Sequence, residues 1–246
     1  MLEKIDLEKS ISKEEYVESI DILRDKLSLL QQEIKKNKIP VIILFEGWGA
    51  SGKGSVISSV INTLDPRGFK VNTVIPSNEL EKRMPPLYRF WENIPPYGNI
   101  AIFDRSWYLD VSTNIIDNIG VFEEQMESYD EINTFEKQLC DDGCVIIKFF
   151  LHITKKEQKK RFEKLMNDKS AEWRVTEKDL KHNKDYDKHY KAFDVMINKT
   201  NTVCSPWNII PAKDKRYTKK RVLEIIISKI EEVTNSYKIV DSLPCS

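Results

Sequence analysis

Residues 41–55, VIILFEGWGASGKGS, constrain the fold of this chain more than any other stretch. Five apolar residues run into a glycine-rich turn and an apolar helical pattern follows, which predicts a buried strand, a loop and a helix. The turn fits the spacing G-x-x-x-x-G-K, with Gly47, Gly52 and Lys53 in place. Loop N–H groups, the positive end of the helix and the lysine ammonium can together hold phosphate oxygens. A tight connection without a ligand is the alternative interpretation.

The rest of this loop is also small and polar. A hydroxyl that reaches Mg²⁺ usually follows the lysine, but Gly54 stands there, so either Ser55 supplies this hydroxyl or the loop lacks it. We therefore predict a phosphate-binding loop that consists of Gly47, Gly49, Gly52, Lys53, Gly54 and Ser55.

Composition excludes several classes of partner. The 246 residues include 39 basic and 39 acidic side chains, so the formal net charge is zero and no general attraction to nucleic acid or membrane is implied. No apolar run approaches the length of a membrane span, and the N-terminus lacks the apolar core of a signal peptide, so we expect a cytoplasmic protein. The four cysteines and three histidines show no metal-ligand spacing, which predicts reduced, structural thiols.

Strand and helix patterns alternate along the whole chain. We predict strands at residues 41–45, 69–75, 99–103, 144–151 and 207–210. This alternation indicates a single α/β domain over residues 1–246: a doubly wound, mostly parallel, five-stranded sheet with helices on both faces. Residues 1–38 hold a long amphipathic helix whose heptad-like seam fits either its own domain or another subunit. Residues 76–95 carry apolar residues at helical spacing, interrupted by two prolines.

Two charged residues follow the third predicted strand. Asp104 lies where folds with a phosphate loop hold Mg²⁺, directly or through water. Arg105 could stabilise charge on a phosphoryl group in transfer, and a structural Asp–Arg pair is the alternative.

Basic residues gather in three further places. Residues 155–191 hold thirteen Lys or Arg against eight Asp or Glu, which predicts a helical lid that includes Arg161 and closes over phosphates, although a solvated face has the same pattern. Arg67 sits beside a turn and could reach the same anion. Lys213, Lys215 and Arg216 begin the last helix, where cations oppose the helix dipole and indicate a bound anion.

Seven segments in order resemble the polyphosphate kinase 2 family, including its polyphosphate:AMP phosphotransferase branch. They are FEGWGASGKG at 45–54, LDPRGF at 64–69, YRFW at 88–91, IAIFDRSWY at 100–108, KKRFEKL at 159–165, EWRVTEKD at 172–179 and SPWNIIPAKDKRYT at 205–218. The resemblance implies a Mg²⁺-dependent phosphotransferase that acts between inorganic polyphosphate and a nucleoside mono- or diphosphate, of adenine or guanine, and forms a homo-oligomer. It also implies residue roles: Lys53 and Arg67 on phosphates, Asp104 on Mg²⁺, Arg105 on the reacting group, Arg161 in the lid, and Lys213, Lys215 and Arg216 along the polyphosphate path.

The chain departs from that family at two places. Gly49 stands where the family usually has a metal-binding or acceptor-orienting Asp, and Leu109-Asp110 stands where it has a small or polar residue and Arg. An alternative is therefore an impaired member that binds nucleotide or polyphosphate without efficient turnover, in which Gly49→Asp with Asp110→Arg would restore activity. An ATP-dependent nucleotide kinase is a third hypothesis, which the abundance of cations disfavours.

Overall fold

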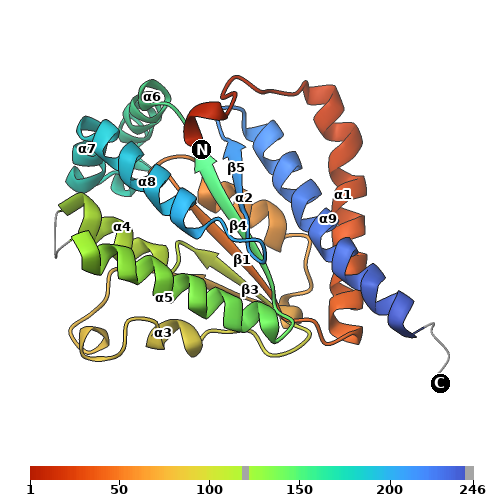
Figure 1. Cartoon of the computed structure of the whole chain (residues 1–246). Coiled ribbons are helices and arrows are strands. Elements are labelled where there is room, and N and C mark those ends of the chain that lie inside the picture. Colours follow the sequence, from red (N-terminus) through yellow and green to blue (C-terminus); the bar gives the residue numbers. More distant parts are fainter. Residues whose placement is uncertain (118–121, 242–246) are drawn as a thin grey trace.

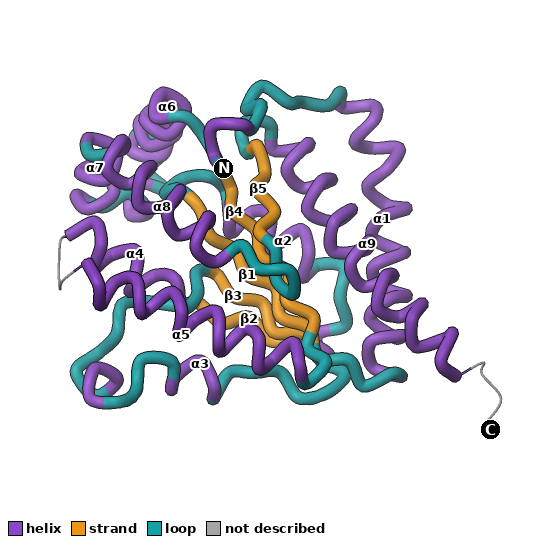
Figure 2. The backbone as a smooth tube through the Cα atoms, in the orientation of Figure 1, coloured by secondary structure: helices purple, strands orange, loops and turns teal. Residues whose placement is uncertain are grey.

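A single parallel sheet organises the computed structural model, which describes residues 1–117 and 122–241. Its strands are β1 (Val41–Gly47), β2 (Phe69–Thr73), β3 (Ile100–Asp104), β4 (Val145–His152) and β5 (Trp207–Pro211). Their order is β2-β3-β1-β4-β5, and every neighbouring pair is parallel (Figure 2). The predicted five-stranded, doubly wound sheet is thus confirmed.

Helices cover both faces of this sheet, as predicted. They are α1 (Lys13–Lys36), α2 (Lys53–Ile61), α3 (Tyr88–Trp91), α4 (Tyr108–Asp117), α5 (Phe122–Asp141), α6 (Lys155–Met166), α7 (Glu177–Lys184), α8 (Tyr186–Thr200) and α9 (Lys215–Asp241). Helices α1, α2 and α9 form one layer, and α4, α5 and α8 form the other (Figure 1). Within the described ranges, no helix combines the length and apolarity that a membrane span requires.

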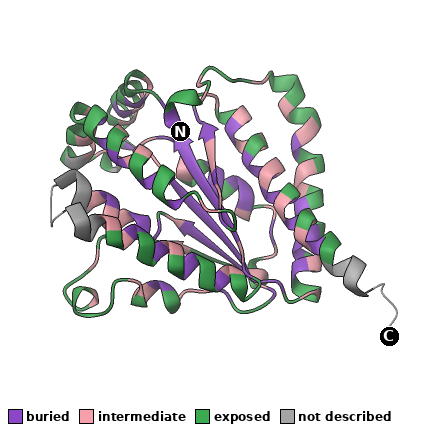
Figure 3. Cartoon of the chain, viewed as in Figure 1, coloured by how far each residue is buried: buried purple, intermediate pink, exposed green. Residues whose placement is uncertain are grey.

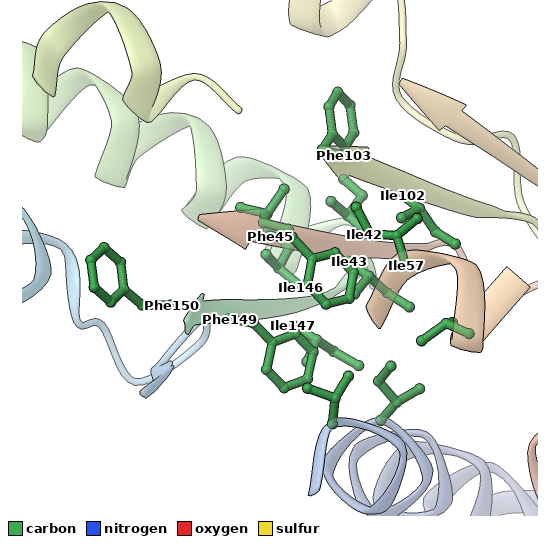
Figure 4. Packing of buried hydrophobic residues seen from close by; sticks show 14 of the residues in the cluster. Ile42, Ile43, Phe45, Ile57, Ile102, Phe103, Ile146, Ile147, Phe149 and Phe150 are labelled. Carbon is green, nitrogen blue, oxygen red and sulfur yellow. The ribbon is translucent and has the colours of Figure 1, made fainter. Parts of the chain in front are cut away.

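The central strand explains why its sequence is a continuous apolar run. Residues 41–45 of β1 are fully buried, because β3 and β4 flank the strand and helices cover both of its faces. Apolar side chains from β1, β3, β4 and α2 meet in this core (Figure 4), and buried residues follow the strands through the middle of the molecule (Figure 3).

The N-terminal helix packs inside its own chain. The Ser12 hydroxyl caps α1 by accepting a hydrogen bond from the N–H of Glu15 at 3.0 Å. Its seam, which includes Ile20, Leu27 and Ile34, is buried, and the main neighbour of α1 is α9. The heptad-like pattern is therefore used within the chain.

Residues 76–95 depart from the predicted helical spacing. They contain only a 3-10 helix, Glu81–Arg83, and the single turn of α3. Pro85 and Pro86 explain this difference, since proline lacks an N–H donor and disfavours helix in the preceding residue. Phe90 is nevertheless buried, and its ring lies 5.7 Å from that of Trp107.

Candidate phosphate-binding site

The loop after β1 owes its path to glycines. Gly47 has φ of +132°, and a Cβ there would lie 2.4 Å from the carbonyl oxygen of Leu151, so a side chain does not fit. Gly52 also has positive φ and is the N-cap of α2, whose first turn exposes Gly54 and Ser55. The N-terminal N–H groups of α2 consequently face the carboxyl edge of the sheet, where anions are favoured.

Lys53 folds back over this loop. Its ammonium donates hydrogen bonds to the carbonyl oxygens of Gly47 at 2.9 Å and Trp48 at 3.1 Å. Burial and the charge of Arg105 lower the pKa of Lys53, and nearby carboxylates, first among them Asp104, act in the opposite direction. The lysine is thus held among charged groups at the mouth of the loop.

Glu46 is a site residue that the sequence analysis missed. It lies on β1 just before the loop, is buried, and accepts a hydrogen bond from the Ser106 hydroxyl at 2.8 Å. Burial raises the pKa of Glu46, whereas the Ser106 bond and the charges of Lys53 and Arg105 act to lower it. The available signal was a single carboxylate inside an otherwise apolar strand.

The end of β3 brings Asp104 and Arg105 beside the loop, as predicted. Asp104 pairs in register with Phe45 of β1, and its carbonyl oxygen accepts a hydrogen bond from Val74. Arg105 adopts a left-handed φ of +63°, an unfavourable conformation for a residue with a Cβ. Its N–H bonds the carbonyl of Phe45 at 3.0 Å, which fixes this turn next to β1.

Arg161 joins three segments at this edge. Its guanidinium donates to the carbonyl oxygens of Ala50 and Ser51 in the loop, at 3.1 and 2.9 Å. It also donates to those of Ala212 and Lys213 after β5, at 2.7 and 3.0 Å, and its Nε bonds Glu157. The structure therefore brings Arg161 to the loop, while its contact with phosphate stays a prediction.

Helices α6 and α7, within the predicted lid, are docked on the loop. Gln158 is buried, and its amide nitrogen donates to the carbonyl oxygen of Gly49 at 3.2 Å. The same amide accepts a hydrogen bond from Asn183 of α7 at 2.9 Å. One side chain thus connects both helices to the loop backbone.

Trp48 anchors the loop on its inner side. Its indole N–H donates to Nδ1 of His152 at 2.9 Å, and its ring stacks on Tyr186 with centroids 3.9 Å apart. Burial lowers the pKa of His152 to about 4, so this imidazole is neutral and can accept the bond near pH 7. The sequence analysis did not identify this anchor.

The basic residues after β5 reach the same edge, but Arg67 does not. Lys213, Lys215 and Arg216 are exposed beside the segment that Arg161 contacts, and Lys213 pairs with Glu8. Arg67 lies just before β2, at the amino ends of the strands. Lys53 lies at the opposite edge of the sheet, after the carboxyl end of β1. The guanidinium of Arg67 bonds Asp65, so the expected convergence of Arg67 with Lys53 is wrong.

Asp110 belongs to a neighbouring pocket of about 430 Å³. Its carboxylate accepts hydrogen bonds from Arg89 at 2.9 Å and Ser77 at 2.7 Å, so its charge is paired. The pocket walls include the rings of Phe90 and Trp107. Among the described residues, Nε of Arg89 is buried without a hydrogen-bond partner.

The fold and this site define an α/β protein that presents a phosphate loop, Lys53, Asp104 and Arg105 at one edge of a parallel sheet. A model of the family described as polyphosphate kinase 2 matches residues 10–238. The chain belongs to the polyphosphate kinase 2 family.

Named relatives and a solved structure agree with this assignment. The chain is 32% identical over 231 residues to a polyphosphate:AMP phosphotransferase of Pseudomonas aeruginosa, with 94% of this chain and 47% of that protein covered. It is 29% identical over 226 residues to an AMP/ADP-polyphosphate phosphotransferase of Meiothermus ruber, with 92% and 85% covered. A polyphosphate kinase 2 crystal structure from Arthrobacter aurescens TC1 superposes with a TM-score of 0.91, at 26% identity, over 95% of this chain and 86% of that one. The chain spans about half the length of the first curated relatives it matches.

Proposed function

We propose that this chain transfers a phosphoryl group between inorganic polyphosphate and a nucleoside mono- or diphosphate. The observation that carries the proposal is the position of the Lys53 ammonium, bonded to the loop carbonyls and influenced by Arg105 and Asp104. The names of its relatives, which specify polyphosphate with AMP or ADP, support the same substrates. Phosphoryl transfer depends mainly on positioning and on neutralising charge, and these residues can do both.

Each residue of the site has a role that fits its geometry. Lys53 can exchange its loop carbonyls for oxygens of adjacent phosphates, because an ammonium on a flexible stem moves readily. Arg105 is exposed beside Lys53 and can neutralise charge on the group in transfer. Lys213, Lys215 and Arg216 lie where further phosphates of a chain would extend along the edge.

Mg²⁺ is part of this proposal. Among the described residues, no group of three or more His, Cys, Asp or Glu could hold a metal by itself. Mg²⁺ typically takes one or two carboxylates and completes its shell with water and substrate phosphates, so Asp104 fits as a protein ligand. When bound, the ion would neutralise charge on the phosphates.

The acceptor nucleotide would occupy the pocket beside Asp110. Tyr88, an exposed aromatic residue of this pocket, can stack on a base. The pocket includes Pro76 and Ser77, which follow β2, so it lies at the same edge of the sheet as Asp104.

A turnover assay tests the proposal. Purified protein would be incubated with polyphosphate, Mg²⁺ and AMP, ADP or GDP, and products separated by anion exchange. We expect nucleotide product from the wild type, a loss of about a hundred- to a thousandfold in Lys53→Ala, and no change in Lys229→Ala, a surface lysine in the middle of α9.

Other outcomes identify the alternatives. No product above Lys53→Ala, together with ligand binding in calorimetry, would identify a member that binds without turnover. Product from ATP alone, with no dependence on polyphosphate, would identify an ordinary nucleotide kinase. The homo-oligomer and the cytoplasmic location stay predictions from the sequence, and native mass spectrometry would test the former.

A further inference from the structure

The contact between Gly49 and α7 points to Asp179, the last residue of the segment 172–179, to which the sequence analysis assigns no role. A Cβ built on Gly49 would lie 3.3 Å from Oδ1 of Asp179 and 3.2 Å from the ring of Phe162. A carboxylate from α7 therefore lies directly against the Gly49 position. Such distances are tighter than ordinary contacts, so any side chain at position 49 would displace these neighbours.

The Asp179 carboxylate is held in a fixed orientation. Its Oδ2 accepts hydrogen bonds from the backbone N–H and the hydroxyl of Thr176, at 3.0 and 2.7 Å, in a capping box at the start of α7. The other oxygen, Oδ1, is the atom nearest to the Gly49 position. A side chain that served only as a helix cap would not need to face the phosphate loop.

The charge of Asp179 reaches the centre of the site. It is one of the carboxylates that favour the protonated form of Lys53, against the effects of burial and of Arg105. Gln158 bonds both the loop, at Gly49, and α7, at Asn183, so these hydrogen bonds hold α7 in place against the loop.

We propose that Asp179 is a positioning residue of the phosphoryl transfer, which supplies a carboxylate to the Lys53 loop from α7 in the space that Gly49 leaves open. A Cβ at position 49 would require Phe162 and Asp179 to shift by a few tenths of an ångström. The inference rests on the proposed function, because it assigns Asp179 a part in that same reaction. It also reverses an expectation from the sequence, since Gly49→Asp would now crowd Asp179 and place two like charges together.

Four variants test this inference by kinetics. Asp179→Asn keeps an acceptor for the Thr176 cap and removes the charge, and we expect kcat to fall about ten- to a hundredfold with a smaller change in KM. Glu177→Gln, which removes an exposed carboxylate from the same helical turn, is the matched control and should stay within about twofold. Gly49→Asp should fall at least as far as Asp179→Asn. The double variant Gly49→Asp/Asp179→Ser, which moves the carboxylate to the loop, should recover about tenfold over Gly49→Asp.

A binding experiment keeps this test separate from that of the proposed function. Calorimetry with tripolyphosphate and Mg²⁺ on the same proteins needs no turnover, and thermal unfolding confirms that each variant is folded. If the wild type shows no turnover, the proposed function fails; the inference then predicts that Asp179→Asn changes affinity for the probe and that Glu177→Gln does not. The inference is overturned if Asp179→Asn matches Glu177→Gln in both measurements. It is also overturned if the free-energy effect of the double variant equals the sum of the effects of its two single changes.

Discussion

A buried ion pair beneath the site offers a sharp test of how this fold is held together. Lys148 on β4 and Glu136 on α5 are both completely buried, with Nζ and Oε2 2.7 Å apart. The ammonium also bonds the Tyr108 hydroxyl at 3.0 Å and the carbonyl of Thr200 at 2.7 Å, so its three donors are satisfied. Burial lowers the pKa of Lys148, and the Glu136 carboxylate opposes this shift.

The perturbation is Lys148→Met, which keeps the length of the side chain and removes its charge. Glu136 would then remain buried, with donors from Trp107, Tyr108 and Ser205 but no cation. Removal of one partner of a buried pair costs about 3–5 kcal/mol. For a chain of this size each kcal/mol lowers Tm by about 2–4 °C, so we expect a fall of about 6–20 °C.

Thermal and urea unfolding, followed by circular dichroism, measure this effect. Adding Glu136→Gln removes the unpaired carboxyl group and keeps an acceptor, so the double variant should regain about 2 kcal/mol over Lys148→Met. Lys137→Met, which breaks an exposed pair with Asp141 on the same helix, is the control and should change stability by less than about 1 kcal/mol. If Lys148→Met unfolds within about 1 kcal/mol of the wild type, the pair does not stabilise the fold as argued.

Two further predictions concern the anchors of the loop. The pKa of His152 is about 4 in the folded protein and 6.5 unfolded, so about 3 kcal/mol of stability present above pH 6.5 should be lost as pH falls to 4. Urea unfolding at several pH values measures this loss, and an unchanged slope in His152→Phe would contradict it. Arg161→Lys keeps the charge but not the planar fork, so kcat and Tm should both fall, Tm by several degrees. A Tm equal to that of the wild type would show that the carbonyl contacts of Arg161 are dispensable.

The sheet and its loop could be predicted because local rules decide them. An apolar run favours a buried strand, and glycines at this spacing before Lys53 favour a tight loop that leads into a helix. The structure has this strand, loop and helix. Residues 76–95 could not be predicted in this way. Their apolar spacing suggests a helix, whereas the two prolines in the middle prevent one. The periodic pattern alone does not show that the effect of the prolines is the stronger.

The partners of charged residues were the least predictable part. Asp110 pairs with Arg89, 21 residues away, and Asp179 lies over Gly49, 130 residues away, so neither contact follows from local sequence. The sequence of a motif therefore does not show which distant residue pairs with a charged side chain in the folded protein. The apparent loss of a carboxylate at Gly49 is such a case, because tertiary structure supplies one from α7.

The contacts of Arg161 affect which cationic side chains are available to bind phosphate. Its five N–H donors bond four carbonyl oxygens and Glu157, so its charge already serves to join α6, the loop and the segment after β5. Backbone carbonyls are present whatever side chains the loop carries, which explains how this docking is compatible with glycine at 49. Phosphate that displaced Arg161 would undock α6 from the loop. Among the described residues, Lys53, Arg105 and the exposed cations at the start of α9 are therefore candidates for the proposed polyphosphate contacts while α6 stays in place.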